Sequence, residues 1–120
     1  MITRIGLYDG LLHEVVEYNG VLYFGGVVAE DLSLDMAGQT EDVLRQVDNL
    51  LSLHGSSRDR ILSVQIYVSD LALKPALNDV WRNFFSLEHL PARATIGVSA
   101  LGPGVLLEMV LTAATGRETR

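Results

Sequence analysis

Near the C-terminus the chain reads Val105-Leu106-Leu107-Glu108-Met109-Val110-Leu111, an apolar run interrupted by one carboxylate. Successive side chains of a β-strand point to opposite faces of a sheet. The run continues to Ala114 and predicts a strand whose two faces are both nearly apolar, so both faces must be covered. A carboxylate is costly to bury unless it is paired or used. Glu108 therefore needs a partner or a chemical role.

The sequence upstream of this strand predicts an α+β domain. Asn19-Gly20, between two β-rich runs, is a strong hairpin signal. Apolar residues at helical spacing predict two helices, and the first of them stops at Gly55. The predicted elements are strands at 15–18, 21–28, 61–68, 93–100 and 105–114, and helices at 37–54 and 73–85. Their order is β-β-α-β-α-β-β, within a single domain of residues 1–120.

Two helices can cover only one face of this predicted sheet. The other face is expected to meet a further copy of the chain, because 48% of the residues are hydrophobic, a high share for a small soluble monomer. In the strand 61–68 the helix-covered face is assigned Leu62, Val64, Ile66 and Val68, and the second face Ile61, Ser63, Gln65 and Tyr67. On the strand 93–100 the second face is assigned Arg93, Thr95, Gly97 and Ser99, small polar groups that leave room for ligand pockets.

Composition excludes several classes of protein. The net charge is -6 and no basic patch is present, so nucleic acid is not expected as a partner. The absence of cysteine excludes disulfides and thiol chemistry. No apolar run reaches the ~18 residues that a membrane span requires. The N-terminus lacks a signal-peptide profile, so we expect a cytoplasmic protein without membrane contact.

Small residues and histidines give weaker signals. His13, His54 and His89 share no ligand spacing, so no metal site is expected. His54 is expected to cap the first helix, whereas His13 is a candidate pocket residue. The pair Gly25-Gly26, inside a predicted strand, is typical of a close backbone approach.

Arg93 and Glu108 are the charged residues best placed for chemistry. Arginine suits a planar, bidentate grip on a carboxylate. If the turn at 102–104 closes a simple antiparallel hairpin, Glu108 lies opposite about Gly97, on the same face as Arg93. The two charges are then roughly 13 Å apart along the strand, too far for a direct ion pair. That gap leaves room for a small anionic ligand or for a charge from an adjacent subunit; an ion pair between subunits is the alternative interpretation.

Several stretches between residues 11 and 115 resemble one known family. They are Pro91-Ala92-Arg93-Ala94-Thr95, Leu101, Leu107-Glu108, Leu22-Tyr23-Phe24-Gly25-Gly26, Ile66-Tyr67-Val68-Ser69-Asp70-Leu71 and Asn78-Asp79-Val80-Trp81-Arg82-Asn83-Phe84-Phe85. Together they resemble the RidA family, also called YjgF/YER057c/UK114. The resemblance implies a chorismate-mutase-like fold with two helices on one sheet face and a homotrimer with clefts between subunits. It also implies an imine deaminase that needs no cofactor and hydrolyses 2-imino or enamino acids, such as 2-aminoacrylate/2-iminopropanoate, to 2-keto acids and ammonia.

The resemblance also implies roles for individual residues. Arg93 matches the family arginine that grips the substrate carboxylate. Glu108 matches the glutamate that positions or activates water, or relays a proton. Thr95 matches a position whose backbone helps to hold ligand and water, and Asn78 and Gly26 match other cleft-lining positions.

The chain departs from the family pattern at three pocket positions. The family's cleft tyrosine falls at Leu12, so that hydroxyl is missing unless His13 substitutes for it. The cysteine often found two residues after the arginine is Thr95, and a serine common before the strand glycine is Gly25. These departures indicate a divergent member with an altered pocket shape.

Three other functions stay open at this stage. A chorismate-mutase-type enzyme would bind a small dicarboxylate through several cations, but only Arg93 stands on the expected face. A non-catalytic metabolite-binding or regulatory trimer would use the same cleft as a sensor. A pathway-specific deaminase would act on intermediates of ring catabolism.

Overall fold

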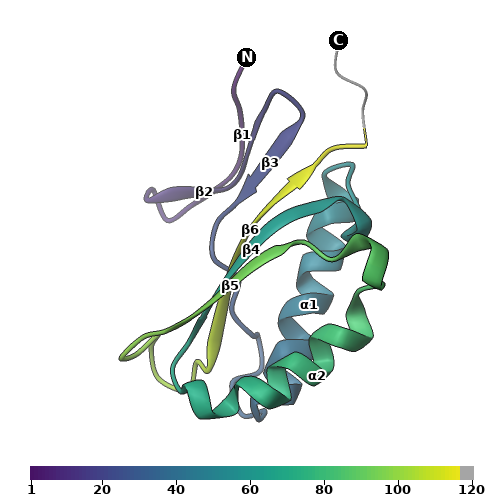
Figure 1. Cartoon of the computed structure of the whole chain (residues 1–120). Helices are drawn as coiled ribbons and strands as arrows, with labels where there is room; N and C mark the ends of the chain where they lie inside the picture. The colour runs from purple at the N-terminus through teal and green to yellow at the C-terminus, as the bar shows by residue number, and fades with distance from the viewer. Residues whose placement is uncertain (117–120) are drawn as a thin grey trace.

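The computed structural model describes residues 1–116, which form one sheet and two helices (Figure 1). The strands are β1 Thr3–Tyr8, β2 Leu12–Tyr18, β3 Val21–Phe24, β4 Ile61–Val68, β5 Ala92–Gly97 and β6 Leu107–Ala114, and the helices are α1 Met36–Leu53 and α2 Lys74–Phe84. Short 3-10 turns occupy Arg58–Arg60, Leu71–Leu73 and Leu87–His89. The α+β class and both helices are confirmed.

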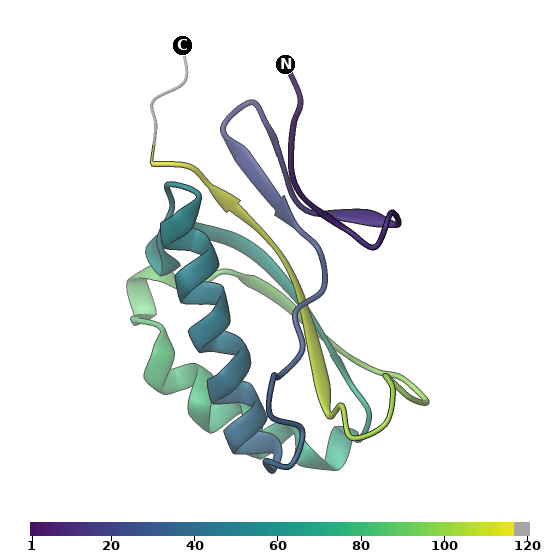
Figure 2. The same ribbon diagram turned by 180° about the vertical axis from the view of Figure 1, so that it is seen from behind.

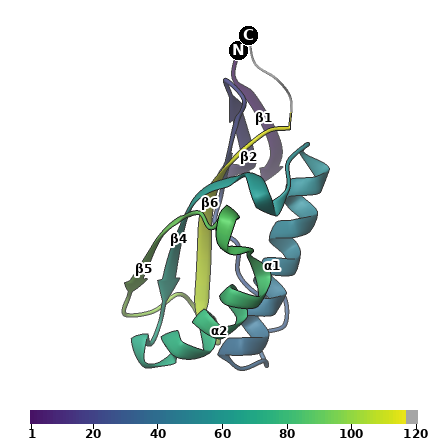
Figure 3. The same ribbon diagram turned by 45° about the vertical axis from the view of Figure 1, so that its right-hand side comes forward.

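The six strands form one mixed sheet in the order β1-β2-β3-β6-β4-β5. Both helices lie on the same side of it, as Figure 3 shows, and the β1–β2 hairpin extends away from them, as Figure 2 shows from behind. The buried core lies between this sheet face and the helices. It includes Val43, Val47 and Leu51 from α1, and Leu77 and Trp81 from α2. Within residues 1–116 no helix is long and apolar enough to cross a membrane.

The pairing of the last two strands differs from the predicted hairpin. β6 pairs antiparallel with both β3 and β4, so it lies in the middle of the sheet. β5 pairs parallel with the outer edge of β4 and is not a hydrogen-bonded neighbour of β6. The prediction that Glu108 lies opposite about Gly97 is therefore wrong. β5 and β6 lie on the two opposite edges of β4, so the segment that connects them passes across the end of β4.

The assignment of faces in β4 is confirmed for Val64, Ile66 and Val68, which are at most 3% exposed. It is wrong at the start of the strand, where Ile61 is buried and Leu62 is 47% exposed. The pairing with β6 shifts register between Ile61 and Ser63. Such a bulge adds one residue to a strand and exchanges the faces of the residues before it.

The N-terminal strand β1 is an element that sequence reasoning missed. It pairs with β2 through a turn in which Asp9 and Gly10 both have positive φ, at 53° and 66°. The predicted Asn19-Gly20 hairpin has the same character, with φ of 52° and 76°, and is confirmed. An Asp-Gly pair carries the same hairpin signal as Asn-Gly. All six residues of β1 are exposed, so no burial pattern marks the strand.

Two buried polar side chains of α1, Gln39 and Asp42, hold two neighbouring loops of the chain. Gln39, which is fully buried, accepts a hydrogen bond from the backbone N–H of Leu106 at 3.0 Å and donates to the carbonyl of Gly104 at 2.9 Å. The carboxylate of Asp42 accepts the backbone N–H groups of Glu30 and Asp31. These contacts fix the loop that follows Gly26 and the segment that leads into β6.

Asp42 stays ionised although it is buried. Burial opposes its charge, but hydrogen bonds from Gln46 and from the backbone of residues 30 and 31 outweigh that effect and hold its pKa below the ordinary value. A group with a depressed folded-state pKa stabilises the fold above its unfolded pKa, about 3.9 for aspartate, and loses that contribution as pH falls through the folded value.

Replacing Asp42 with asparagine is expected to lower the free energy of unfolding by about 1–3 kcal/mol at pH 7, because a side-chain N–H then faces donors. The difference from the parent protein should stay constant down to about pH 5 and shrink below about pH 4. Denaturant unfolding across pH measures both effects. Asp35→Asn is the matched control, since Asp35 caps α1 through the N–H of Gly38 and asparagine caps equally well. Equal losses in the two variants would contradict this account.

Candidate functional site

Arg93 is held on the helix-covered side of β5 by neutral partners. Its Nε donates to the Thr95 hydroxyl at 2.9 Å, and its Nη2 donates to Asn78 Oδ1 at 2.6 Å. The guanidinium carbon lies 4.8 Å from the centre of the Trp81 ring, a cation–π contact with α2. These three contacts fix the orientation of the guanidinium and leave Nη1 without a protein acceptor in the described chain.

Arg93 has no carboxylate partner among residues 1–116 within ion-pair distance. Burial lowers the pKa of its guanidinium from the ordinary value, and the charge of Arg82 nearby lowers it further. Both effects disfavour the cation, yet arginine remains protonated in proteins. An anion bound at Nη1 would relieve this cost, so the geometry of Arg93 is compatible with an anionic ligand.

The space beside Arg93 is a cavity of about 360 Å³ between α2 and β5. Its lining residues are Lys74, Asn78, Trp81, Arg82, Arg93 and Thr95. Three of these side chains are cationic. The expectation that Arg93 is the single cation on its face is therefore wrong, because α2 presents Lys74 and Arg82 toward the same strand. Their spacing of four residues on either side of Asn78 marks one helix face and was visible in the sequence.

Glu108 lines a second and larger cavity of about 820 Å³ at the other side of the molecule. This cavity lies between the β1–β2 hairpin, the segment after β3 and α1. A Cβ placed on Gly26 would lie 1.8 Å from Glu108 Oε2, so the missing side chain makes room for the carboxylate. The close approach predicted from Gly25-Gly26 is confirmed at Gly26.

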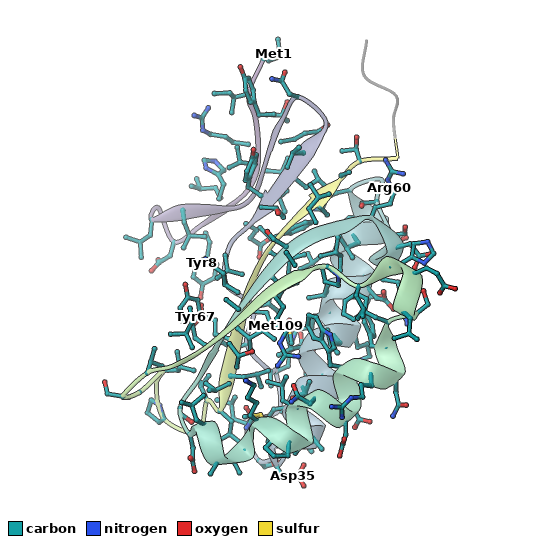
Figure 4. The ribbon with its side chains drawn as sticks, viewed as in Figure 1. Met1, Tyr8, Asp35, Arg60, Tyr67 and Met109 are labelled. Carbon is teal, nitrogen blue, oxygen red and sulfur yellow. The ribbon has the colours of Figure 1, made fainter. Side chains whose placement is uncertain are left out.

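Arg93 and Glu108 lie on opposite faces of the sheet. Arg93 is the register partner of Val64, whose side chain is buried under the helices. Glu108 is the register partner of Tyr67, which is labelled in Figure 4. Tyr67 is three residues from Val64 on the same strand, and because side chains alternate along a strand, the two point to opposite faces. The prediction that the two charges share a face is wrong. Within one chain the structure brings Asn78 and Thr95 to Arg93, and Gly26 to Glu108.

The remaining predicted pocket residue, His13, lines neither cavity. Its neighbours Leu12 and Glu14 line the Glu108 cavity, and alternation along β2 turns His13 the other way. Tyr8, labelled in Figure 4, also lines that cavity and was not predicted. No three side chains capable of holding a metal ion come together in residues 1–116.

The chain matches known proteins along almost its whole length. The family model described as Endoribonuclease L-PSP matches residues 7–115. A RutC family protein of Haemophilus ducreyi is 34% identical over 118 residues, which cover 98% of this chain and 100% of that protein.

Solved structures agree with these sequence matches. An uncharacterized protein from Pseudomonas aeruginosa has a TM-score of 0.90 at 32% identity, with 96% of this chain and 99% of that one covered. NMB1025 of Neisseria meningitidis, a member of the YjgF protein family, has a TM-score of 0.89 at 29% identity, with 98% of each chain covered. This chain therefore belongs to the RidA family, also called YjgF/YER057c/UK114, whose family model carries the description Endoribonuclease L-PSP.

Proposed function

We propose that this protein hydrolyses 2-imino acids to 2-keto acids and ammonia, at a site that two neighbouring subunits of a homotrimer build together. The observation that carries the proposal is the unpaired Arg93 guanidinium, which neutral partners hold at the wall of a cavity. A guanidinium in that state is suited to the planar carboxylate that every 2-imino acid carries.

The separation of Arg93 and Glu108 supports a site between subunits. The two residues lie on opposite sheet faces and line different cavities, so one chain alone does not direct both at one small ligand. In a ring of three copies, the Arg93 cavity of one subunit meets the Glu108 cavity of the next. The sheet face left uncovered by the helices then lies against the neighbouring copies, which covers the exposed Tyr23, Leu62 and Ile96.

The chemistry asked of this site is modest. Arg93 binds the substrate carboxylate, and the Glu108 carboxylate accepts a proton from a water molecule that attacks the imine carbon. Glu108 returns that proton to the former imine nitrogen, which gives a carbinolamine with one hydroxyl and one amino group. The Glu108 carboxylate then transfers the hydroxyl proton to the amino group, so the C–N bond breaks, ammonia leaves and the C=O bond of the keto acid forms. Orientation together with one general acid/base group supplies an acceleration on the order of 10²–10⁴.

Cleavage of RNA, which the description of the family model names, is not the function that this geometry supports. RNA binding relies on a positively charged surface that neutralises phosphates. This chain carries a net charge of -6, and the larger cavity is lined by Glu14, Glu30 and Glu108 against a single Arg45. A non-catalytic metabolite-binding trimer would use the same Arg93 cavity, and turnover distinguishes the two.

Arg93→Lys is expected to lower kcat/KM for 2-iminopropanoate on the order of 10²-fold, because lysine keeps the charge but loses the planar fork. The imine is generated by an amino-acid oxidase, and its loss is followed in the presence of the variant. Arg58→Lys is the matched control, since Arg58 also lies over an aromatic ring, that of Phe84, but lines neither cavity. Parent-like turnover by Arg93→Lys would refute the carboxylate clamp. Saturable binding of the keto acid without any turnover would favour the sensor.

Co-expression of Arg93→Ala with Glu108→Gln tests the shared site. Each variant alone is expected to be inactive. In randomly mixed threefold rings, a site is intact when a Glu108→Gln subunit supplies Arg93 and the neighbouring Arg93→Ala subunit supplies Glu108, which occurs in about one site in four. The control is Arg93→Ala mixed with Asn78→Ala, which alter the same half of the site. A stable monomer by native mass measurement, or mixed trimers that stay inactive, would contradict the intersubunit site.

Gly26→Ala is expected to displace the Glu108 carboxylate and to lower kcat on the order of ten-fold, with less effect on KM. The new methyl group meets the end of a flexible side chain, so thermal unfolding should change little. The adjacent Gly25→Ala is the matched control, because its Cβ would meet only backbone oxygens at 3.8 and 3.9 Å. Equal activity in the two variants would argue against the position assigned to Glu108.

A further inference from the structure

The cations of the Arg93 cavity are more numerous than one carboxylate requires. Lys74, Asn78 and Arg82 recur at four-residue spacing along α2 and line the cavity together with Arg93. Three positive side chains thus border a space of about 360 Å³ in a chain whose net charge is -6. A monocarboxylate ligand would neutralise only one of them.

The three cations differ in whether the protein already neutralises them. Arg82 forms an ion pair with Asp79 at 3.1 Å and is 71% exposed. Neither Lys74, the single lysine of the sequence, nor Arg93 has a carboxylate within ion-pair distance in the described part of the chain. Two uncompensated positive charges therefore face the same cavity: Arg93, which is half-buried and held by hydrogen bonds, and Lys74, which is exposed.

We propose that the ligand of this cavity carries two anionic groups, a carboxylate bound by Arg93 and a second anion bound by Lys74. The inference rests on the proposed function for the reaction, and it makes 2-imino acids with an anionic side chain the preferred substrates. Lys74 lies one helical turn from Asn78, the residue that holds Arg93, a separation of about 6 Å along α2. A diacid of about four or five carbons spans a similar distance at ~1.5 Å per bond.

A solvated surface lysine is the simpler interpretation of Lys74. Two observations argue against it: Lys74 lines the cavity, and it has no carboxylate partner in the described part of the chain. The nearest cation along the same stripe, Arg82, is matched by an acidic neighbour on its own helix, whereas Lys74 is not. The unmatched position is the one that a bound anion would complete. Lys74 should therefore determine selectivity more strongly than Arg82 does.

The decisive experiment compares two imines of equal chain length, 2-iminoglutarate and 2-iminopentanoate, both generated by amino-acid oxidases. The parent protein is expected to favour the dianion, and Lys74→Ala to lower the ratio of the two kcat/KM values roughly five-fold, as expected for one partly exposed charge pair. Lys74→Glu should lower the ratio further. Arg82→Ala should lower it less, and Arg4→Ala, which removes an exposed charge on β1, should leave it unchanged. An unchanged ratio in Lys74→Ala, or a parent preference for the neutral side chain, overturns the inference.

Calorimetric binding separates this inference from the proposed reaction. The ligands are 2-oxoglutarate, 2-oxopentanoate and 2-oxo-4-phosphonobutanoate, and each is measured with the parent protein and Lys74→Ala. The inference is supported, even if no imine is hydrolysed, when either dianion binds more tightly than 2-oxopentanoate and this advantage is lost in Lys74→Ala. The dianion that binds more tightly then identifies the second group as carboxylate or phosphate. Imine turnover with no Lys74-dependent preference in binding or catalysis refutes the inference alone. Neither binding nor turnover refutes both proposals.

Discussion

The structure depends on β6 being held along both of its edges. Its backbone pairs with β3 on one side and β4 on the other, and its alternate side chains Leu107, Met109 and Leu111 are buried under the helices. A strand fixed in this way cannot rotate or slip by one residue without turning its apolar face outward. Glu108 is thereby committed to the opposite face, where Gly26 leaves space for it.

The central position of β6 places the two charges of the candidate site far from each other in the sheet. β5 must pair with the free edge of β4, and its parallel register with β4 turns Arg93 toward α2. That helix supplies Asn78 and Trp81, which orient the guanidinium without neutralising it. One cavity is consequently rich in cations and the other in carboxylates. Complementary charge of this kind favours the approach of a second copy with the two cavities facing each other.

Local elements could be predicted from the sequence, whereas strand pairing could not. Helical spacing and turn residues such as Asn19-Gly20 act within a few residues, so both helices and the second hairpin were found. The partners of β6 are far away in the chain, from 39 residues for Val68 and Leu107 to 93 residues for Val21 and Ala114. A turn between 97 and 107 is compatible with either a hairpin or a crossover. The bulge after Ile61 was missed because it arises only from the pairing of β4 with β6. The strand β1 was missed because all its residues are exposed, so its sequence shows no alternation between buried and exposed positions. The role of Lys74 needed knowledge of which strand α2 faces.

An arginine that a protein already neutralises has little to gain from a ligand. A direct ion pair between Arg93 and Glu108 would satisfy both charges within one chain and leave no demand for a substrate carboxylate. The sheet prevents that pairing, and hydrogen bonds to Thr95 and Asn78 replace only part of the water lost around the guanidinium. Burial, and next to it the charge of Arg82, lowers the pKa of Arg93, which is the direction expected when the charged form is incompletely solvated. A bound anion would recover the free energy of the missing solvation. The sheet, which keeps Glu108 away from Arg93, therefore leaves the guanidinium able to bind the carboxylate of a ligand.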